Sequence, residues 1–424
     1  MPEETKPLKR RESDRGFRTA TEVLMRGYDP HLTLGAARPA VFRSSTYVFE
    51  SPEAAERAFS VMSGRSRAAQ GEETKLIYAR FNHPNAEIVE DHLVPLEEGA
   101  EAAAVFNSGM AAIMTSILSV AKPGDKILYT TPIYGGTQSL IQQFLEPFGI
   151  QGVPVQGGDC HAWETAVRTT ENLRVILIES PANPTLHMTD IAGTVACAKQ
   201  RTGAAEPPVI MVDNTFLGPV FQHPLTLGAD LCLYSATKFL GGFSDLIAGA
   251  VIGSDKDLIK KIKARRALFG NILPPDECWM LDGRLPTVVL RMTRASKNAQ
   301  RIAEALAGHK NIGKLYYPTL FTDPDQIRIR DQQCDFPGSL FSIDLKGGKN
   351  AAFDFLRQLR ISRNAVSLGG VETLACHPKT TTHSGVPAAE LQLAGVTDGL
   401  VRVSVGIEDW RDLLADFEQA LDKI

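Results

Sequence analysis

The 424-residue chain lacks the sequence features of disulfide-stabilised and metal-binding proteins. Its six cysteines include no C-x-x-C pair, and scattered cysteines in a chain of this length are typical of reduced thiols. The nine histidines include no H-E-x-x-H motif, and no two of them accompany cysteines at zinc-finger spacing. We therefore expect no disulfide framework and no metal site, and we expect most cysteines to be small buried hydrophobic side chains.

Strong net charge and long apolar runs are also missing. The net charge is −4 with a pI of about 6.2, which gives no electrostatic footprint for nucleic acid or an anionic membrane. No apolar run approaches the roughly 18 residues that span a bilayer, and the polar start of the chain has no signal-peptide core. These absences predict a cytoplasmic protein with a small-molecule substrate and no nucleic-acid or membrane partner.

Two common nucleotide-binding motifs are incomplete or absent. No G-x-G-x-x-G occurs, so the usual pyrophosphate cradle of a nicotinamide dehydrogenase is missing. Residues 308–315 match a P-loop up to the last position, where Leu315 has no oxygen for magnesium. This segment also follows a predicted helix instead of opening one, and we interpret it as a turn. Any cofactor must therefore be bound by other residues.

The chain does have a regular alternation of strand and helix patterns after Pro84. Its length and its 43% hydrophobic content predict two or more domains. Seven apolar segments separated by helical patterns, such as 110–120 and 135–148, predict a parallel α/β sheet that is buried on both faces. The predicted strands are Ala102–Phe106, Lys126–Tyr129, Gly152–Val155, Val175–Ile178, Val209–Val212, Leu231–Tyr234 and Ala248–Ile252.

The remaining segments predict a second domain and two polar excursions. A helix over 287–306 precedes a region that mixes a helix, 351–360, with short strands at 339–344 and 401–405, as expected of a smaller α+β domain. We place the domain boundary near Gly283, which gives an α/β domain over 81–283 and a C-terminal domain over 284–424. Residues 1 to about 18 and 64–74 are polar, and we expect a mobile arm and an exposed loop there.

Polar side chains stand where the predicted strands end, which is the edge that carries active sites in open α/β sheets. Asp213 ends one strand, and Lys238 follows another behind Ser235 and Thr237. Such a lysine can bind the aldehyde of pyridoxal 5'-phosphate covalently, while the aspartate pairs with the pyridine nitrogen and the two hydroxyls bind phosphate. Taken alone, the Ser-x-Thr-Lys run is more typical of a surface lysine.

Two further strand ends suit the same ligand. Ser108 can cap a helix whose exposed amides, at Gly109 and Met110, bind a phosphate, although an ordinary capped helix has the same pattern. Tyr134 follows the next strand and can stack on a flat ring or serve as a structural tyrosine.

An amide and an arginine complete the candidate residues. Asn183 lies between Pro181 and Pro184 and suits a hydrogen bond to a phenolic oxygen, or it is a turn residue. Arg402 lies inside an apolar strand, where a cation needs an anionic partner. That partner is either a substrate carboxylate or a carboxylate of the protein.

Several strings at these positions belong together. S-G-M, V-D-N-T, S-A-T-K, S-L-G-G and V-R-x-S-V-G-x-E-D all occur in this order. With them the chain, from about Arg18 to its C-terminus, resembles the Cys/Met-metabolism or trans-sulfuration family of fold-type I pyridoxal-phosphate enzymes. The resemblance implies a mostly parallel seven-stranded sheet domain and a smaller C-terminal α+β domain. It also implies pyridoxal 5'-phosphate as the cofactor and an amino acid as the substrate.

The resemblance implies contacts between subunits. Tyr78 and Arg80 look like the family pair that reaches the phosphate of a neighbouring subunit's cofactor. Residues 1–80 would then form an N-terminal arm and inter-subunit segment. Similar proteins are homotetramers built from dimers that share active sites.

The resemblance also implies catalytic roles. Lys238 would remove the α-proton of the substrate, and Asp213 would keep the pyridine nitrogen protonated. Tyr134 would stack on the ring and donate a proton to the departing sulfur or oxygen. Ser367 and Arg402 would hold the substrate carboxylate.

The substrate is indicated by a departure from several relatives. Val366 precedes S-L-G, where cystathionine γ-lyases and γ-synthases carry a glutamate that suits the distal amino group of cystathionine. An apolar residue here resembles methionine γ-lyases or β-lyases. Gly136, however, stands where methionine γ-lyases have a cysteine, and the stretch 268–271 lacks their Lys-Asp pair. A second acidic residue, Glu372, is an alternative contact for a charged substrate.

The sequence assigns no role to two other departures from the relatives. Phe243 replaces a common histidine, and Lys379 stands where relatives often have alanine. The sequence thus predicts pyridoxal-phosphate-dependent elimination at the γ or β carbon of a sulfur-containing amino acid, similar to that of methionine γ-lyases. The open alternatives are γ-replacement on an O-acylhomoserine, by a cystathionine γ-synthase or a sulfhydrylase, and cystathionine β- or γ-lyase activity.

Overall fold

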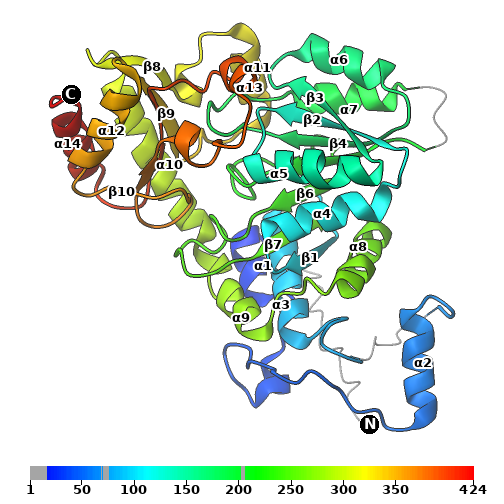
Figure 1. The fold of residues 1–424 in the computed structure, drawn as a ribbon. Coiled ribbons are helices and arrows are strands. Elements are labelled where there is room, and N and C mark those ends of the chain that lie inside the picture. Colours follow the sequence, from blue (N-terminus) through cyan, green and yellow to red (C-terminus); the bar gives the residue numbers. More distant parts are fainter. Residues whose placement is uncertain (1–16, 68, 70–75, 202–205) are drawn as a thin grey trace.

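A computed structural model describes residues 17–67, 69, 76–201 and 206–424 (Figure 1). Most of the predicted polar arm and part of the predicted 64–74 loop lie outside the described residues. The described chain forms a seven-stranded sheet and a five-stranded sheet, each with its own helices. Within these ranges no helix has the length and apolar character needed to cross a membrane.

The larger sheet contains the seven predicted strands in the order β1-β7-β6-β5-β4-β2-β3. All neighbours are parallel except β7, which runs antiparallel to both β1 and β6. The prediction of a mostly parallel sheet is therefore confirmed. Its strands are β1 (Ala102–Phe106), β2 (Lys126–Thr131), β3 (Gln151–Gln156), β4 (Leu173–Glu179), β5 (Val209–Asp213), β6 (Leu231–Tyr234) and β7 (Gly249–Gly253).

Helices cover both faces of this sheet. In β1, Ala104 and Phe106 pack with the helices on one face, whereas Ala103 and Val105 face the opposite side. This alternation follows from the two-residue repeat of a strand and explains why the strands are apolar throughout. The first face is covered by α4 (Gly109–Val120) and α8 (Lys256–Phe269), and the opposite face by α3 (Pro84–Leu93), α6 (Cys160–Thr169), α7 (Ile191–Lys199) and α9 (Pro275–Asp282).

The predicted helix over 135–148 is not a uniform α-helix. It consists of α5 (Gly135–Ser139), a wider π-type turn, η3 (Leu140–Leu145), and a short 3-10 turn, η4 (Glu146–Phe148). Pro147 has no amide hydrogen, so regular α-helical bonding cannot continue through the last turn. The segment is helical, as predicted, but it is not one regular α-helix.

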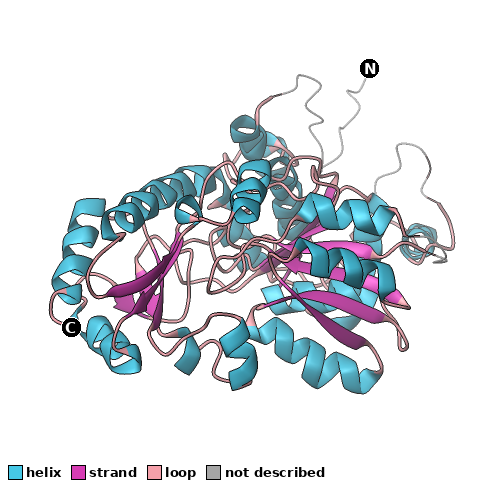
Figure 2. Ribbon diagram, turned by 90° about the horizontal axis from the view of Figure 1, so that it is seen from above, coloured by secondary structure: helices cyan, strands magenta, loops and turns pink. Residues whose placement is uncertain are grey.

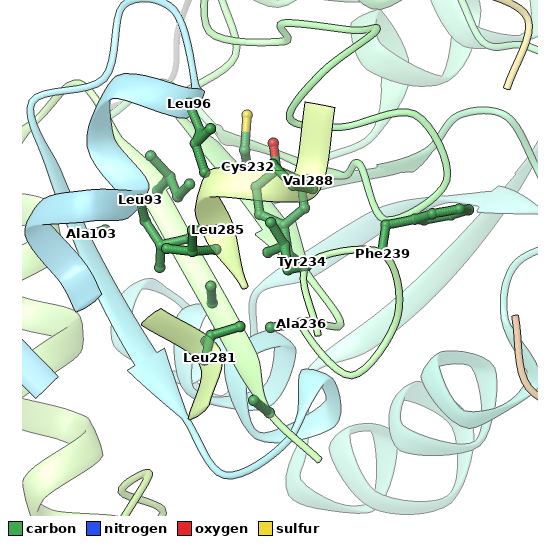
Figure 3. Close-up of a cluster of buried hydrophobic side chains, with 14 of the residues drawn as sticks. Leu93, Leu96, Ala103, Cys232, Tyr234, Ala236, Phe239, Leu281, Leu285 and Val288 are labelled. Carbon is green, nitrogen blue, oxygen red and sulfur yellow. The ribbon is translucent and has the colours of Figure 1, made fainter. Parts of the chain in front are cut away.

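A buried cluster anchors the turn that carries Lys238 (Figure 3). Ala236 and Phe239 flank the lysine in sequence and are 0% and 4% exposed. Both belong to the same buried hydrophobic cluster as Leu93 of α3 and Leu281 of α9, on this face of the sheet. Apolar burial on both sides of Lys238 therefore fixes its main chain, while its own side chain remains only partly buried.

The smaller sheet has the order β10-β11-β12-β9-β8, with helices on its outer face (Figure 2). This arrangement confirms the predicted α+β region, although β8, β10 and β11 were not predicted. The boundary near Gly283, and the division into 81–283 and 284–424, stay predictions. The elements are η5 (Leu285–Thr287), α10 (Val288–Leu306), β8 (Ile312–Tyr316), η6 (Pro318–Leu320), α11 (Pro324–Gln333), β9 (Leu340–Leu345), α12 (Gly348–Gln358), β10 (Arg363–Asn364), β11 (Leu374–Cys376), η7 (Pro378–Thr380), α13 (Ala388–Leu393), β12 (Leu400–Ser404) and α14 (Trp410–Leu421).

The N-terminal segment lies along the larger domain and then leaves it. Its elements are α1 (Thr19–Met25), η1 (Pro30–Thr33) and α2 (Pro52–Met62), with η2 (Val94–Leu96) following α3. Arg38 donates to the Trp279 carbonyl of α9 over 3.1 Å, whereas α2 stands apart from the sheet (Figure 1). Leu34 and Val48 are 104% and 97% exposed, so this segment presents apolar side chains outside the core.

Candidate active site

Most of the predicted site residues meet at the carboxyl edge of the larger sheet, opposite residues of the smaller domain. Asp213 ends β5, and Lys238 lies in the turn after β6. The ε-amino nitrogen of Lys238 donates to the Ser367 hydroxyl over 3.0 Å, and Ser367 lies between β10 and β11. The lysine and the predicted carboxylate-binding serine are thus brought together from the two domains.

The environment of Lys238 favours a neutral amine. Burial, followed by the nearby Arg402 guanidinium, lowers the pKa of Lys238 to about 8. The Lys238 amide donates to the Ser235 carbonyl over 3.0 Å, which closes the turn. A lysine with a lowered pKa on a fixed turn is suited to attack an aldehyde.

Thr215 holds Asp213 in place. The main-chain amide and the hydroxyl of Thr215 both donate to Oδ1 of Asp213, over 3.1 and 2.6 Å. The same hydroxyl accepts the amide of Ser235 over 2.9 Å, so β5 and the Lys238 turn are linked through one side chain. Burial raises the pKa of Asp213. A cation such as a protonated pyridine nitrogen therefore fits beside this carboxyl.

The start of α4 has the geometry that the predicted phosphate contacts require. The Ser108 hydroxyl accepts the amide of Ala111 over 3.1 Å, which confirms the cap. The first amides of a helix, here those of Gly109 and Met110, have no acceptor within the helix and suit an anion. A Cβ atom at Gly109 would lie 2.8 Å from the Cβ of Ser235, so only glycine permits this approach.

The Thr237 hydroxyl is engaged with the main chain. It donates to the Ala248 carbonyl over 3.1 Å and accepts the Ala248 amide over 3.0 Å. In this arrangement it joins the turn to the residue before β7. Its role as a phosphate contact stays a prediction. The first amides of α4 and the close approach of Gly109 to Ser235 fit a bound phosphate more directly.

Arg402 of β12 is 2% exposed and hydrogen-bonded to neutral groups. It donates to Oδ1 of Asn183 over 3.1 Å and to the carbonyls of Val366 and Ser367 over 2.7 and 3.2 Å. None of these acceptors is a carboxylate. The described hydrogen bonds of Arg402 therefore include no salt bridge to a protein carboxylate, which was the alternative. A buried guanidinium with neutral partners still suits a substrate carboxylate.

Tyr134 lies at the start of α5, with a half-exposed ring. A Cβ atom at Gly136 would lie 2.6 Å from Cε1 of Tyr134 and 3.2 Å from the sulfur of Met110. The tyrosine ring therefore occupies the space that a side chain at position 136 would need. A larger side chain at position 136, such as the cysteine of methionine γ-lyases, would displace the ring from this position.

Sequence reasoning missed Glu179, the last residue of β4. Its side chain is 4% exposed, and its two oxygens each accept a main-chain amide over 2.9 Å, one from Tyr134 and one from Asn183. Burial, followed by the charge of Asp213, raises the pKa of Glu179 to about 8. A carboxylate that ends a predicted apolar strand was a usable signal, because Asp213 was recognised from the same pattern.

A second missed residue is His383, which is 2% exposed. Burial and the nearby Arg402 lower the pKa of His383 to about 4, so this imidazole is neutral at physiological pH. Its Nδ1 atom shares a hydrogen bond with the Thr382 hydroxyl over 2.9 Å. The sequence offered little signal for it, since single histidines are common in cores.

The other departures from relatives have structural surroundings of their own. The Phe243 ring lies 5.1 and 5.4 Å from the guanidinium carbons of Arg284 and Arg291, in cation–π contacts. Lys379 forms a 2.8 Å ion pair with Asp398.

Glu372, the alternative contact for a charged substrate, accepts a hydrogen bond from the Ser244 hydroxyl. Its carboxyl group is therefore already engaged with the loop that follows Lys238.

The structure does not place Tyr78 and Arg80 among the contacts of Lys238 in the described chain. Arg80 instead donates to the Ala267 carbonyl, near the end of α8, over 2.7 Å. Its guanidinium also lies 4.9 Å from the Phe81 ring, and Tyr78 is exposed. The pair therefore lies on the outside of one chain, beside α8.

Comparisons with known proteins agree with this site. Residues 20–422 match the family model described as Cys/Met metabolism PLP-dependent enzyme. The chain is 38% identical over 404 residues to an L-methionine gamma-lyase of Pseudomonas putida, which covers 95% of this chain and 96% of that protein. It is 35% identical over 402 residues to a cystathionine gamma-synthase of Mycobacterium bovis, which covers 95% and 96% of the two chains.

A solved structure extends the likeness to the whole fold. The crystal structure of cystathionine gamma-lyase from Lactobacillus plantarum complexed with L-serine has a TM-score of 0.85 and 33% identity. It covers 96% of this chain and 99% of that chain. The Lys238 turn, the Asp213 carboxyl and the helix amides fit pyridoxal 5'-phosphate, and the match spans nearly the whole chain. The protein belongs to the family of pyridoxal-phosphate-dependent enzymes of cysteine and methionine metabolism.

Proposed function

We propose that the protein cleaves a carbon–sulfur bond of a sulfur-containing amino acid by elimination at the γ or β carbon, with L-methionine as the preferred substrate class. When bound, pyridoxal 5'-phosphate accepts the electron pair that remains on the α-carbon after proton loss. Elimination from methionine would consume one water molecule and release methanethiol, ammonia and a 2-oxo acid. The Pseudomonas putida relative carries this activity in its name, which supports the proposal.

The residues of this chain have distinct tasks in the proposed reaction. Lys238 binds the cofactor aldehyde and, once released, takes the α-proton, a step that its lowered pKa favours. Asp213 holds the pyridine nitrogen, and Arg402 with Ser367 binds the substrate carboxylate. Tyr134 stacks on the ring and gives a proton to the departing sulfur.

Other residues hold the cofactor in place. The amides of Gly109 and Met110 bind its phosphate, with Ser235 and Thr237 beside them. Asn183 accepts from Arg402 through Oδ1, so its amide nitrogen is the atom that remains to donate to the phenolic oxygen.

The observation that carries the substrate assignment is the apolar residue beside the carboxylate site. Val366 is 53% exposed, and its carbonyl accepts Arg402 over 2.7 Å, so this residue lies next to the arginine that we propose for the substrate carboxylate. A charged distal group beside this apolar side chain would lose hydration without gaining a partner. Glu372, which is bound by Ser244, does not supply one in this arrangement.

The test is a steady-state comparison of substrates with the holoenzyme. Methionine, cystathionine and cysteine are each supplied alone, and 2-oxo acid and ammonia are measured. We expect kcat/KM to be highest for methionine. A clear preference for cystathionine would contradict the proposal.

A second candidate is γ-replacement on an O-acylhomoserine. The Mycobacterium bovis relative, named as a cystathionine gamma-synthase, supports it, and an uncharged acyl group such as acetyl suits Val366 equally well. The same assay with an O-acylhomoserine and a thiol, measuring the thioether product, separates the two candidates. Faster thioether formation than methionine cleavage would favour replacement.

We also propose that two chains share each site and that dimers assemble into homotetramers. Apolar side chains near Arg80 and after the Lys238 turn remain uncovered, with Leu268 70% and Ile247 66% exposed. Such surfaces suit a second copy of this chain. Arg80 and Tyr78 then reach the phosphate of the partner's cofactor, and residues 1–80 act as the arm and inter-subunit segment.

Complementation tests the shared site. An Arg80→Ala subunit mixed with a Lys238→Ala subunit forms one intact site per mixed dimer. Random mixing should therefore restore about a quarter of the wild-type activity, because half of the dimers are mixed. Complete mixing without recovered activity would show that Arg80 does not act across the interface.

We place the protein in the cytoplasm. All six cysteines are unpaired thiols in the structure, which suits a reducing compartment. Fractionation of the source cells, with the activity followed in each fraction, tests this placement.

A further inference from the structure

Glu179 is a buried residue to which the proposed reaction assigns no role. It is paired in register with Asp213 across the parallel strands β4 and β5, so the two carboxyl groups project from the same face of the sheet. The Glu179 side chain is 4% exposed, compared with the half-buried Asp213. It therefore lies deeper than the residue that would touch the cofactor ring.

The contacts of Glu179 join two loops that each carry a proposed ring contact. Oε2 accepts the amide of Tyr134, which opens α5 after β2. Oε1 accepts the amide of Asn183, in the turn after β4. One carboxyl group thus fixes the main chain of two residues that approach the ring from different strands.

Burial of the Glu179 carboxyl group costs free energy. A buried carboxyl group loses hydration, and both of its hydrogen bonds here come from neutral main-chain amides. A glutamine could not replace it fully, since one oxygen acceptor would become an NH₂ donor that faces an amide. Two acceptor oxygens at this point are what the two loops require.

We propose that Glu179 is a positioning residue, which aligns Tyr134 and Asn183 with Asp213 around the cofactor ring. The inference rests on the proposed function, which assigns those three residues to the ring. It names a residue that acts through others and touches neither substrate nor cofactor.

The test uses a matched control in the other domain. Asp416 of α14 is also a buried acid, 5% exposed, and it accepts the main-chain amides of Arg360, Ile361 and Ser362. Glu179→Gln and Asp416→Asn therefore make the same chemical change in the same kind of hydrogen-bonded group. Only the first lies near the site.

Three quantities are measured for each variant: the melting temperature of the apoprotein, its dissociation constant for pyridoxal 5'-phosphate, and the visible circular dichroism of the bound cofactor. We expect both variants to lower the melting temperature. Only Glu179→Gln should alter the dichroism and weaken cofactor binding, by about tenfold for a lost buried hydrogen bond. Its kcat should fall more than its KM rises.

An unchanged dichroism spectrum and dissociation constant in Glu179→Gln, with only a lower melting temperature, would overturn the inference. If Glu179→Gln does not fold, Glu179→Asp serves as the second variant, because it keeps the carboxyl group but is one methylene too short for both bonds. The cofactor measurements need no substrate. A wrong substrate assignment would therefore appear in the assays of the wild-type protein and leave this test intact.

Discussion

The two walls of the candidate site differ in how firmly they are held. The wall from the larger domain consists of strand ends, where Asp213 is bound by Thr215 and Glu179 binds two main-chain amides. The wall from the smaller domain presents Arg402 and Ser367 beside Val366, whose side chain is 53% exposed. In the proposed function, the first wall carries the cofactor chemistry, and Val366 on the second wall selects the substrate.

The difference has a physical origin. Neighbouring parallel strands bring carboxyl groups together in register, as with Glu179 and Asp213, so a change at one residue disturbs the other. Val366 lies in the segment that joins β10 and β11, where an exposed side chain is less constrained by packing. Changes on the first wall should therefore abolish activity, whereas changes on the second should redirect it.

The largest effect is expected from Lys238→Ala. Loss of the amine that binds the aldehyde and takes the α-proton should reduce activity by at least about a thousandfold. Borohydride treatment of the wild-type holoenzyme should leave the cofactor attached to the peptide that contains Lys238. Lys256→Ala, a change in an exposed ion pair with Glu101, is the control and should keep normal activity. Attachment to another lysine would contradict the assignment.

Asp213→Ala should have the next largest effect. The cofactor should still bind, but kcat should fall by about a hundredfold to a thousandfold, because the pyridine nitrogen loses the group that keeps it protonated. Activity assays at saturating cofactor, with binding measured separately, check this result. Near-normal turnover would show that Asp213, on the larger-domain wall, is not needed for the reaction.

Val366→Glu should change specificity rather than abolish activity. The new carboxylate can pair with the distal ammonium of cystathionine, and we expect the ratio of kcat/KM for cystathionine to that for methionine to rise by about tenfold. Val366→Gln controls for size, since it adds length without charge. An equal loss with both substrates would mean that the smaller-domain wall also holds the common chemistry.

The smallest effect concerns pH. Because the pKa of Lys238 is lowered to about 8, the rate at which the apoprotein binds the cofactor should rise by about fivefold from pH 7 to pH 8 and level off above it. The unfolded state keeps a higher lysine pKa and binds more protons, so the apoprotein should also gain stability as pH rises from about 8 to about 10.5. Stopped-flow absorbance measures the rate. A rate that still rises steeply near pH 10 would mean an unperturbed lysine.

Features that depend only on residues close together in the sequence were predictable. β1 (Ala102–Phe106) and β6 (Leu231–Tyr234) have the predicted bounds, because a buried strand shows its apolar run directly. The Ser108 cap was also predictable, since a cap acts on amides within three residues. β10 was not predicted, because its two residues are too few to show a periodicity.

The sequence by itself determined the order of the strands along the chain, the residues at their ends and the cofactor class, because these depend on local patterns and short strings. Only the tertiary structure decided which of those residues meet. Lys238 bonds Ser367 across 129 positions, and Arg402 bonds Asn183 across 219. Pairing over such separations depends on strand order and on how the two domains pack, which local pattern does not encode. For the same reason the contacts of Glu179 with Tyr134 and Asn183 became visible only in the structure.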